Sequence, residues 1–123
     1  MPSRVAVIIL NWNGAALLRQ YLPSVVANTP EAVGHVFVAD NGSTDGTLEE
    51  LRRMAGEYPA FGGFTVAENG ANLGFGAACN RSAAKGSAPL LFFLNLDTEV
   101  WPDVFLRLDE AAVRAPQETA AFE

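Results

Sequence analysis

The order of sequence patterns along the chain constrains its fold more than any single residue does. Apolar runs of strand length alternate with helical patterns, and polar turns separate them. The runs predicted as strands are 5–10, 33–39, 61–67 and 90–94. The segments predicted as helices are 14–27, 47–54, 75–85 and 102–115. Strands that alternate with helices indicate the α/β class, with a mostly parallel sheet covered by helices on both faces.

Individual residues refine this prediction. The first run, Val-Ala-Val-Ile-Ile-Leu, is apolar throughout, which is typical of a strand buried on both faces. Pro23 lies inside the first helical pattern and removes one helical hydrogen bond, so we expect a kink or break near Arg19. Arg52 and Arg53 lie in the last turn expected for the second helix, and Pro102 suits the first position of the fourth.

The composition limits the classes of protein to which the chain can belong. Its 123 residues suffice for one domain with a single core, and 50% of them are hydrophobic. The formal net charge of -6, without a basic run, argues against a nucleic-acid partner. The single cysteine, Cys79, fits a reducing compartment. No apolar stretch reaches the roughly 20 residues that span a bilayer, so we expect a cytoplasmic protein without a transmembrane segment.

Polar residues follow each predicted strand. The four polar segments are 11–14, 40–47, 68–76 and 95–99. All four lie at the carboxyl ends of predicted strands, and in open α/β sheets ligands bind at that edge. We therefore expect the four segments to converge on one crevice.

An acidic cluster follows the fourth predicted strand. Asp97 comes soon after the apolar run, with Asn95 and Glu99 on either side. Hard cations such as Mg²⁺ or Mn²⁺ take oxygen ligands, and a bound diphosphate needs such a cation. Asp97 is therefore the first candidate for a metal ligand, supported by Glu99 and Asn95. The alternative is that Asp97 caps the following turn or helix.

The other polar segments contain residues suited to a nucleotide. Asp40 or Asn41 is suited to hydrogen-bond a nucleobase or a ribose hydroxyl, and Trp12 to pack against the base or form a wall of the pocket. Gly74 and Gly76 let the backbone approach a ligand closely, and the amino end of the following helix favours phosphate.

Each of these roles has a structural alternative. Asn41 and Gly42 form an ordinary turn pair, and one of the residues 43–45 is an ordinary helix cap. Trp12 is equally compatible with core packing, and the glycines near Phe75 with simple turns. The functional interpretation depends on the four segments occurring together at successive strand ends.

Other chemistries are disfavoured. His35, the only histidine, lies near the start of the second predicted strand, far from the crevice, and is interpreted as a non-catalytic surface residue. Cys79 lies in an apolar helical segment and is interpreted as a small core residue. The sequence lacks a Ser-His-Asp or Cys-His set, zinc-ligand spacing, a phosphate-binding loop that ends in Gly-Lys-Ser/Thr, and a Gly-x-Gly-x-x-Gly motif after the first strand.

As a set, four motifs resemble those of the family 2 nucleotide-sugar glycosyltransferases, whose fold is called GT-A. The motifs are 7–14, 38–47, 72–76 with Asn80, and 94–100. They occur in the family's order and cover most of the chain. The rhamnosyltransferase-like branch is most similar, because it tends to have Asn-Trp-Asn, Asp-Asn and an Asn-Pro-Asp form of the metal motif, which reads Asn-Leu-Asp in this chain. The resemblance implies a Rossmann-like GT-A half-domain.

The resemblance also implies roles for the matched residues. Residues 11–13 with Asp40 and Asn41 would hold the nucleoside, and residues 72–80 would line the diphosphate and sugar pocket. In the family's Asp-x-Asp motif, Asp97, with Glu99 in support, would bind Mg²⁺ or Mn²⁺ bridged to the diphosphate. The residues implied in substrate binding are Asn11, Trp12, Asn13, Asp40, Asn41, Ser43, Asn72, Gly74, Asn80, Asn95 and Asp97.

Two features depart from the family pattern. Asn95 stands where the family has the first Asp of the motif, so Asp97 has less help in holding the metal. Members of the family are usually much longer, and their acceptor-binding half, with an Asp or Glu base, follows the metal motif. We therefore expect residues 1–123 to form a single donor domain without the acceptor half, and no residue is assigned as the base. Exposed sheet edges are expected to support homodimerisation.

The resulting hypothesis is a metal-assisted, inverting glycosyltransferase. It would transfer a sugar from a nucleotide diphosphate sugar to a hydroxyl of a glycan or lipid-linked acceptor, in polysaccharide or cell-surface glycan synthesis. Its expected location is cytoplasmic, and peripheral attachment to the inner face of the membrane is an alternative that the sequence leaves open. The alternatives are a non-catalytic nucleotide-binding module or truncated fragment, and a sugar nucleotidyltransferase. The last is disfavoured because residues 11–14 lack the basic residue of its first loop.

Overall fold

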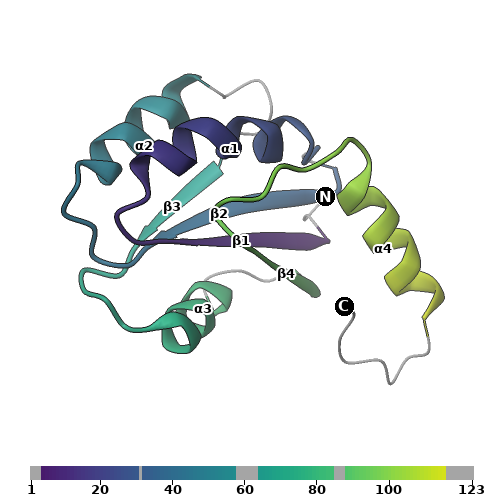
Figure 1. Ribbon diagram of the computed structural model, residues 1–123. Coiled ribbons are helices and arrows are strands. Elements are labelled where there is room, and N and C mark those ends of the chain that lie inside the picture. The colour runs from purple at the N-terminus through teal and green to yellow at the C-terminus, as the bar shows by residue number, and fades with distance from the viewer. Residues whose placement is uncertain (1–3, 31, 58–63, 85–87, 116–123) are drawn as a thin grey trace.

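The computed structural model describes residues 4–30, 32–57, 64–84 and 88–115 of the chain. Strands and helices alternate along it as the sequence pattern predicts (Figure 1). The elements are β1 (Val5–Asn11), α1 (Ala15–Ala27), β2 (Gly34–Asp40), α2 (Thr47–Glu57), β3 (Phe64–Glu68), α3 (Phe75–Ala83), β4 (Leu90–Leu94) and α4 (Val104–Arg114). No helix of the described segments is long and apolar enough to cross a membrane.

The four strands form one parallel sheet in the order β3-β2-β1-β4. The register is flush at the carboxyl ends, where Asn11 of β1 pairs with Asp40 of β2, and Asp40 pairs with Glu68 of β3. Along the chain, the sheet first grows from β1 through β2 to β3 and then returns to the other side of β1. This reversal creates a switch point between β1 and β4, and ligands of open α/β sheets bind beside such points.

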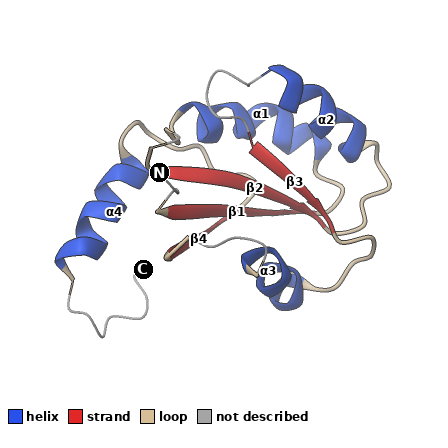
Figure 2. Cartoon of the chain, turned by 180° about the vertical axis from the view of Figure 1, so that it is seen from behind, coloured by secondary structure: helices blue, strands red, loops and turns tan. Residues whose placement is uncertain are grey.

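Helices cover both faces of the sheet, as expected. Figures 1 and 2 show α1 and α2 on one face and α3 on the opposite face. The main core fills the space beneath α1 and α2, with Val7 and Ile9 of β1 and Leu18 of α1 among its buried members. Side chains alternate along a strand, so the buried Ile8 points to the face that α3 covers. Burial of β1 on both faces is thus confirmed.

Of the kink or break expected near Arg19 from Pro23, the break does not occur in helix α1. It runs without interruption from residue 15 to residue 27, with Pro23 inside. Proline at this position removes the N–H donor that would bond to the carbonyl of Arg19, but one missing bond does not end a helix that is well packed. Leu18, Leu22 and Val25 of the same helix are buried against the sheet and hold it in place.

The boundaries of two further elements differ from their predictions. Helix α2 extends to Glu57, so Arg52 and Arg53 lie before its last turn rather than in it. Their predicted position failed because the apolar pattern ends at Met54 while the backbone continues for nearly another turn. Strand β3 is described from Phe64 onward, and the predicted strand residues 61–63 and helix residue 85 lie outside the described residues.

Helix α4 begins at Val104 rather than at Pro102. Asp103, between them, has a φ of 69°, a left-handed conformation that an α-helix does not accept, so the helix begins after it. Phe105 in the first turn of α4 is fully buried. Its ring meets Phe92 of β4 edge to face, with ring centroids 5.4 Å apart, and this contact fixes α4 beside the sheet.

Candidate functional site

The floor of the candidate site is a buried polar cluster where β1 and β2 end. Asn11 is fully buried, and its amide Nδ2 donates to Asp40 Oδ1 at 3.0 Å and to Ser43 Oγ at 3.2 Å. Asp40 is 1% exposed and accepts two further bonds, from the hydroxyl of Ser43 at 2.6 Å and from its backbone N–H at 3.0 Å. These hydrogen bonds join Asp40 to Asn11 and fix Ser43 in the turn that follows β2.

The turn after β1 is tied to the turn after β2. The backbone N–H of Asn13 donates to Ser43 Oγ at 2.9 Å, and the N–H of Thr44 donates to Asn13 Oδ1 at 2.7 Å. Asn13 has a φ of 51°, a conformation that Asn adopts more readily than most residues. Trp12, between these contacts, is 56% exposed, so the core-packing alternative for this residue is wrong.

The loop after β3 is held by Asn41 at the end of β2. Asn41 is 2% exposed, and its Oδ1 accepts from the N–H of Leu73 at 3.0 Å and from Asn69 Nδ2 at 3.3 Å. Its Nδ2 donates to Asn72 Oδ1 at 2.9 Å, and the same oxygen accepts the N–H of Gly74 at 2.9 Å. One side chain thus organises residues 69–74.

Two glycines allow the loops to touch. Gly42 has a φ of 83°, and a Cβ there would lie 2.9 Å from backbone atoms of Ala71. A Cβ at Gly14 would overlap Leu96 and Asn11, which brings the loop after β4 against the turn after β1. The predicted convergence of all four polar segments is thus seen in their direct contacts.

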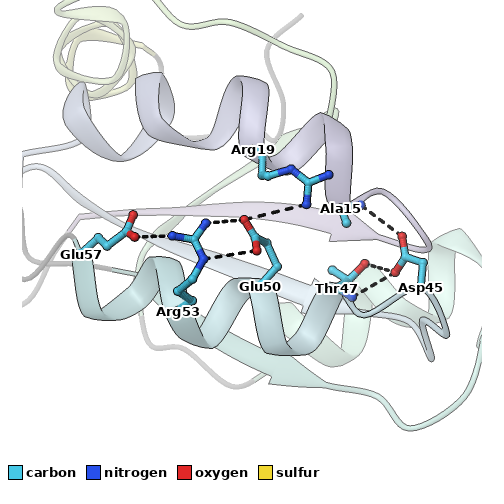
Figure 3. Close-up of polar contacts among 7 residues, drawn as sticks. All are labelled: Ala15, Arg19, Asp45, Thr47, Glu50, Arg53 and Glu57. Atoms are coloured by element: carbon cyan, nitrogen blue, oxygen red, sulfur yellow. Dashed lines mark hydrogen bonds and ion pairs between the residues drawn. The ribbon is translucent and has the colours of Figure 1, made fainter.

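Asp45 connects the amino ends of two helices (Figure 3). Its Oδ2 accepts the N–H of Ala15 in α1 at 3.2 Å, and its Oδ1 accepts the N–H of Thr47 in α2 at 3.1 Å together with the Thr47 hydroxyl. The hydroxyl bond is the main reason that the pKa of Asp45 lies below its ordinary value. The helix-capping alternative for the segment 43–45 is therefore confirmed at Asp45.

Charged side chains also join α1 to α2 on the solvent side of the helices. Glu50 lies 2.5 Å from Arg53 and 3.9 Å from Arg19, and Arg53 also reaches Glu57 (Figure 3). The hydrogen bond from Arg53 is the main cause of a lowered pKa at Glu50. The side chains of these residues are between 17% and 55% exposed, so this network supports the helix pair and is not a candidate for chemistry.

The segment after β4 presents its polar residues to solvent. Asn95, Asp97 and Glu99 are exposed and alternate with the half-buried Leu96 and Thr98. Across the described ranges, no three His, Cys, Asp or Glu side chains gather into a metal-binding group. Mg²⁺ is commonly held by one or two carboxylates together with substrate phosphates and water, so this donor set fits a cation shared with a substrate.

The amino end of α3 is open. Gly74 precedes the helix with a φ of 79°, and no side chain caps the first turn. Phe75 is 65% exposed, and Asn80 on the same helix is exposed. A Cβ at Gly76 would meet nothing within 4 Å, so packing within the described chain does not require glycine there.

The two residues that the sequence interpretation excluded from chemistry, His35 and Cys79, have structural positions in the fold. His35 is the second residue of β2, at the end opposite the loops, where its Nε2 pairs with Thr65 Oγ1 at 2.7 Å and its ring meets Phe37. It is half-buried rather than fully on the surface. Cys79 is buried in α3, as predicted, and burial raises the pKa of its thiol.

Asn69 is a member of the cluster that the sequence interpretation did not single out. It is 6% exposed, its N–H donates to the carbonyl of Asp40 at 2.9 Å, and its amide reaches Asn41. Its Oδ1 has no hydrogen-bond partner in the described part of the chain. The signal that could have found it is its position directly after β3, next to the strand end that pairs with Asp40.

Comparisons with known proteins match almost the whole chain. Residues 6–120 match the family described as "Glycosyl transferase family 2". An N-acetylglucosaminyl-diphospho-decaprenol L-rhamnosyltransferase of Mycobacterium tuberculosis is 34% identical over 85 residues, which are 69% of this chain and 25% of the relative. The chain therefore spans about a quarter of the length of the curated relatives that it matches.

Solved structures share the fold. The mannosyltransferase PcManGT from Pyrobaculum calidifontis, in complex with GDP-Man and Mn²⁺, has a TM-score of 0.72 and 28% identity, over 83% of this chain and 29% of that one. TarS 1–349 from S. aureus in complex with UDP-GlcNAc has a TM-score of 0.70 and 22% identity, over 89% of this chain and 30% of that one. At this identity the TarS likeness shows the fold alone.

Proposed function

Because the chain belongs to glycosyl transferase family 2, we propose that it forms the donor-binding part of a glycosyltransferase that uses a nucleotide diphosphate sugar. The observation that carries this proposal is the mutual contact of four polar loops at the carboxyl edge of the sheet, next to its switch point. The mannosyltransferase with GDP-Man and Mn²⁺ has the same fold, which supports a donor of this class.

The burial pattern divides the proposed site into a floor and a lining. Asn11, Asp40 and Asn41 are buried and bonded to neighbouring loops, so they shape the floor. The exposed residues at the same edge are available to a ligand: Trp12, Asn13, Asn72, Gly74, Asn80, Asn95 and Asp97. We assign Trp12 and Asn13 to the nucleoside, and the lining from Asn72 to Asn80 to the diphosphate and sugar.

Asp97 is the proposed ligand of Mg²⁺ or Mn²⁺, with Glu99 and the amide oxygen of Asn95 in support. Asp97 is exposed and makes no side-chain hydrogen bond within the described segments, so its carboxylate is available for this role. The cation would act as a Lewis acid that offsets the charge of the departing nucleoside diphosphate. The side chain of Leu96, the residue before Asp97, lies against the turn at Gly14, so the segment that carries Asp97 borders the loop after β1.

The proposed reaction is a direct displacement with inversion. The acceptor hydroxyl oxygen forms a bond to the anomeric carbon while the bond from that carbon to the diphosphate oxygen breaks, and a base removes the hydroxyl proton. No described residue is assigned as that base. The rhamnosyltransferase relative is named for a lipid-linked diphosphate acceptor, which supports a lipid-linked glycan acceptor and a location at the membrane surface.

Calorimetric titration with UDP, TDP and GDP, each with and without Mn²⁺, tests the donor site. We expect one nucleotide to bind and Mn²⁺ to strengthen its binding. Asp97→Ala should abolish the effect of Mn²⁺, whereas the control Glu110→Ala, which removes an exposed carboxylate on α4, should leave it unchanged. A folded chain that binds none of the three nucleotides would contradict the proposal.

A non-catalytic nucleotide-binding module is the second candidate, and the neutral Asn95 favours it because it removes one charge from the proposed metal site. Hydrolysis of the bound donor separates the two candidates, since a module without catalytic capacity would bind the nucleotide sugar and leave it intact.

Homodimerisation through a sheet edge remains a proposal. Strand β4 forms one edge of the described sheet, and its Leu91 and Phe93 are 47% and 48% exposed. Uncharged, apolar edge strands readily pair with other strands. Sedimentation at several concentrations tests this proposal, and a monomer at all of them would contradict it.

A further inference from the structure

We propose that Asn41 is a positioning residue. It orients the side-chain amide of Asn72 so that the NH₂ group of Asn72 faces the nucleotide sugar. The proposal rests on the proposed function, because it concerns how the donor site is presented. It assigns Asn41 an indirect role, through Asn72, rather than contact with the ligand.

Two backbone N–H groups fix the orientation of both amides. The N–H of Leu73 donates to Asn41 at 3.0 Å, and the N–H of Gly74 donates to Asn72 at 2.9 Å. A backbone N–H can only donate, so each side chain must turn its oxygen toward it. The NH₂ of Asn41 then points to the oxygen of Asn72, at a distance of 2.9 Å.

This arrangement uses the whole hydrogen-bonding capacity of the Asn72 oxygen. A carbonyl oxygen has two lone pairs, and Asn41 and Gly74 occupy both. Asn72 is exposed, and its NH₂ has no partner among the residues that the structure describes. The group left for a ligand is therefore a hydrogen-bond donor, which suits a phosphate or carbonyl oxygen and does not suit a cation.

The position of Asn41 explains why it can set this orientation. It is 2% exposed and follows directly on β2, so the sheet holds it in place. Its neighbour Gly42 lies against the backbone of Ala71, which brings the two loops within reach of each other. The chain of bonds runs from the end of β2 through Asn41 and Asn72 to Gly74, directly before α3.

A double-mutant cycle tests the proposal by titration with the nucleoside diphosphate that the unmodified chain binds, in the presence of Mn²⁺. Asn72→Ala and Asn41→Ala should each weaken binding about tenfold, the effect of one lost hydrogen bond to a charged group. The double variant should be no weaker than either single variant, because both changes remove the same NH₂ group from the ligand. Gln20→Ala, which removes an exposed amide on α1, should bind normally.

The variant Asn41→Asp distinguishes the effect of Asn41 on the orientation of Asn72 from its general support of the loop 69–74. The carboxylate keeps the bonds that Asn41 accepts from Leu73 and Asn69, but it cannot donate to Asn72. Binding should weaken as in Asn41→Ala, while the amide hydrogen of Leu73 should exchange with solvent as slowly as in the unmodified chain. In Asn41→Ala, the amide hydrogens of Leu73 and Gly74 should both exchange faster.

The outcomes distinguish this proposal from the function on which it rests. Failure of the unmodified chain to bind any nucleoside diphosphate would overturn the donor site, whatever the exchange rates. Normal binding by Asn41→Asp, additive losses in the double variant, or unchanged exchange at Gly74 in Asn41→Ala would overturn the role of Asn41 even if the chain binds its nucleotide well.

Discussion

Replacing Asp45 by alanine should destabilise the fold through two helices at once. The side chain accepts the first N–H of α1 at Ala15, and in α2 it accepts both the N–H and the hydroxyl of Thr47. Most capping residues serve one helix. Loss of Asp45 would leave donors at two helix ends without this partner and would release the loop that carries Ser43.

The expected magnitude follows from the two caps. Replacement of a capping Asp by Ala costs about 0.5–2 kcal/mol per helix. Asp45 is exposed, so each cap should lie in the lower part of this range, and the free energy of unfolding should fall by about 2 kcal/mol in total. Asp45→Asn keeps one acceptor oxygen and should lose about half as much.

Urea denaturation at several pH values measures this effect. The pKa of Asp45 is lowered in the folded chain from the ordinary 3.8, so its carboxylate contributes stability above pH 3.8. That contribution is lost as the pH falls through the folded value. The difference between the unmodified chain and Asp45→Ala should therefore be constant between about pH 5 and 7 and shrink in more acidic solution.

Glu49→Ala is the matched control. Glu49 lies in the first turn of α2, is exposed, and makes no side-chain hydrogen bond within the described chain. Because Glu49 and Asp45 are both acidic, the two alanine variants change the net charge by the same amount. Its loss should be no more than about 0.5 kcal/mol. Equal losses for the two variants, or a difference for Asp45→Ala that grows in acid, would refute the capping argument.

Two further substitutions and one chemical modification have clear expected outcomes. Gly42→Ala should lower the free energy of unfolding by about 2 kcal/mol or more in a denaturant titration, because of its positive φ and the 2.9 Å approach to Ala71. Phe105→Ala should cost about 3–5 kcal/mol by the same assay, since it removes a fully buried ring in contact with Phe92. Cys79 should react with iodoacetamide far more slowly in the folded chain than in denaturant, because it is buried and its pKa is raised.

The α/β fold and the family resemblance could be predicted from the sequence, and both are confirmed. The apolar run that forms β1 indicates by its composition that this strand is buried on both faces. Parallel strands bring their carboxyl ends to one edge of the sheet. Pro23 shows the limit of this reasoning. Local chemistry predicts a kink or a break there, but the helix continues, because packing of Leu18, Leu22 and Val25 outweighs one missing hydrogen bond.

The hydrogen bonds between side chains of the candidate site could not be predicted. The sequence indicates that Asn41 and Asn72 belong to the same region, but the bond between them depends on the register of β2 against β3. The same holds for Asp45, whose carboxylate reaches Ala15 across the gap between two loops. Which polar atoms face each other, and which remain for a ligand, is a property of the assembled sheet.

The central position of β1 affects the order in which the chain can acquire its structure. On one side β1 pairs with β2, the next strand to be synthesised, but on the other side Val5 pairs with Leu90 of β4. Pairing of two strands that lie so far apart in the sequence is slow, because the chain loses conformational entropy before the contacts between the strands stabilise it. During synthesis, one edge of the apolar strand β1 therefore stays unpaired until β4 has been made, and an unpaired apolar edge is prone to aggregation.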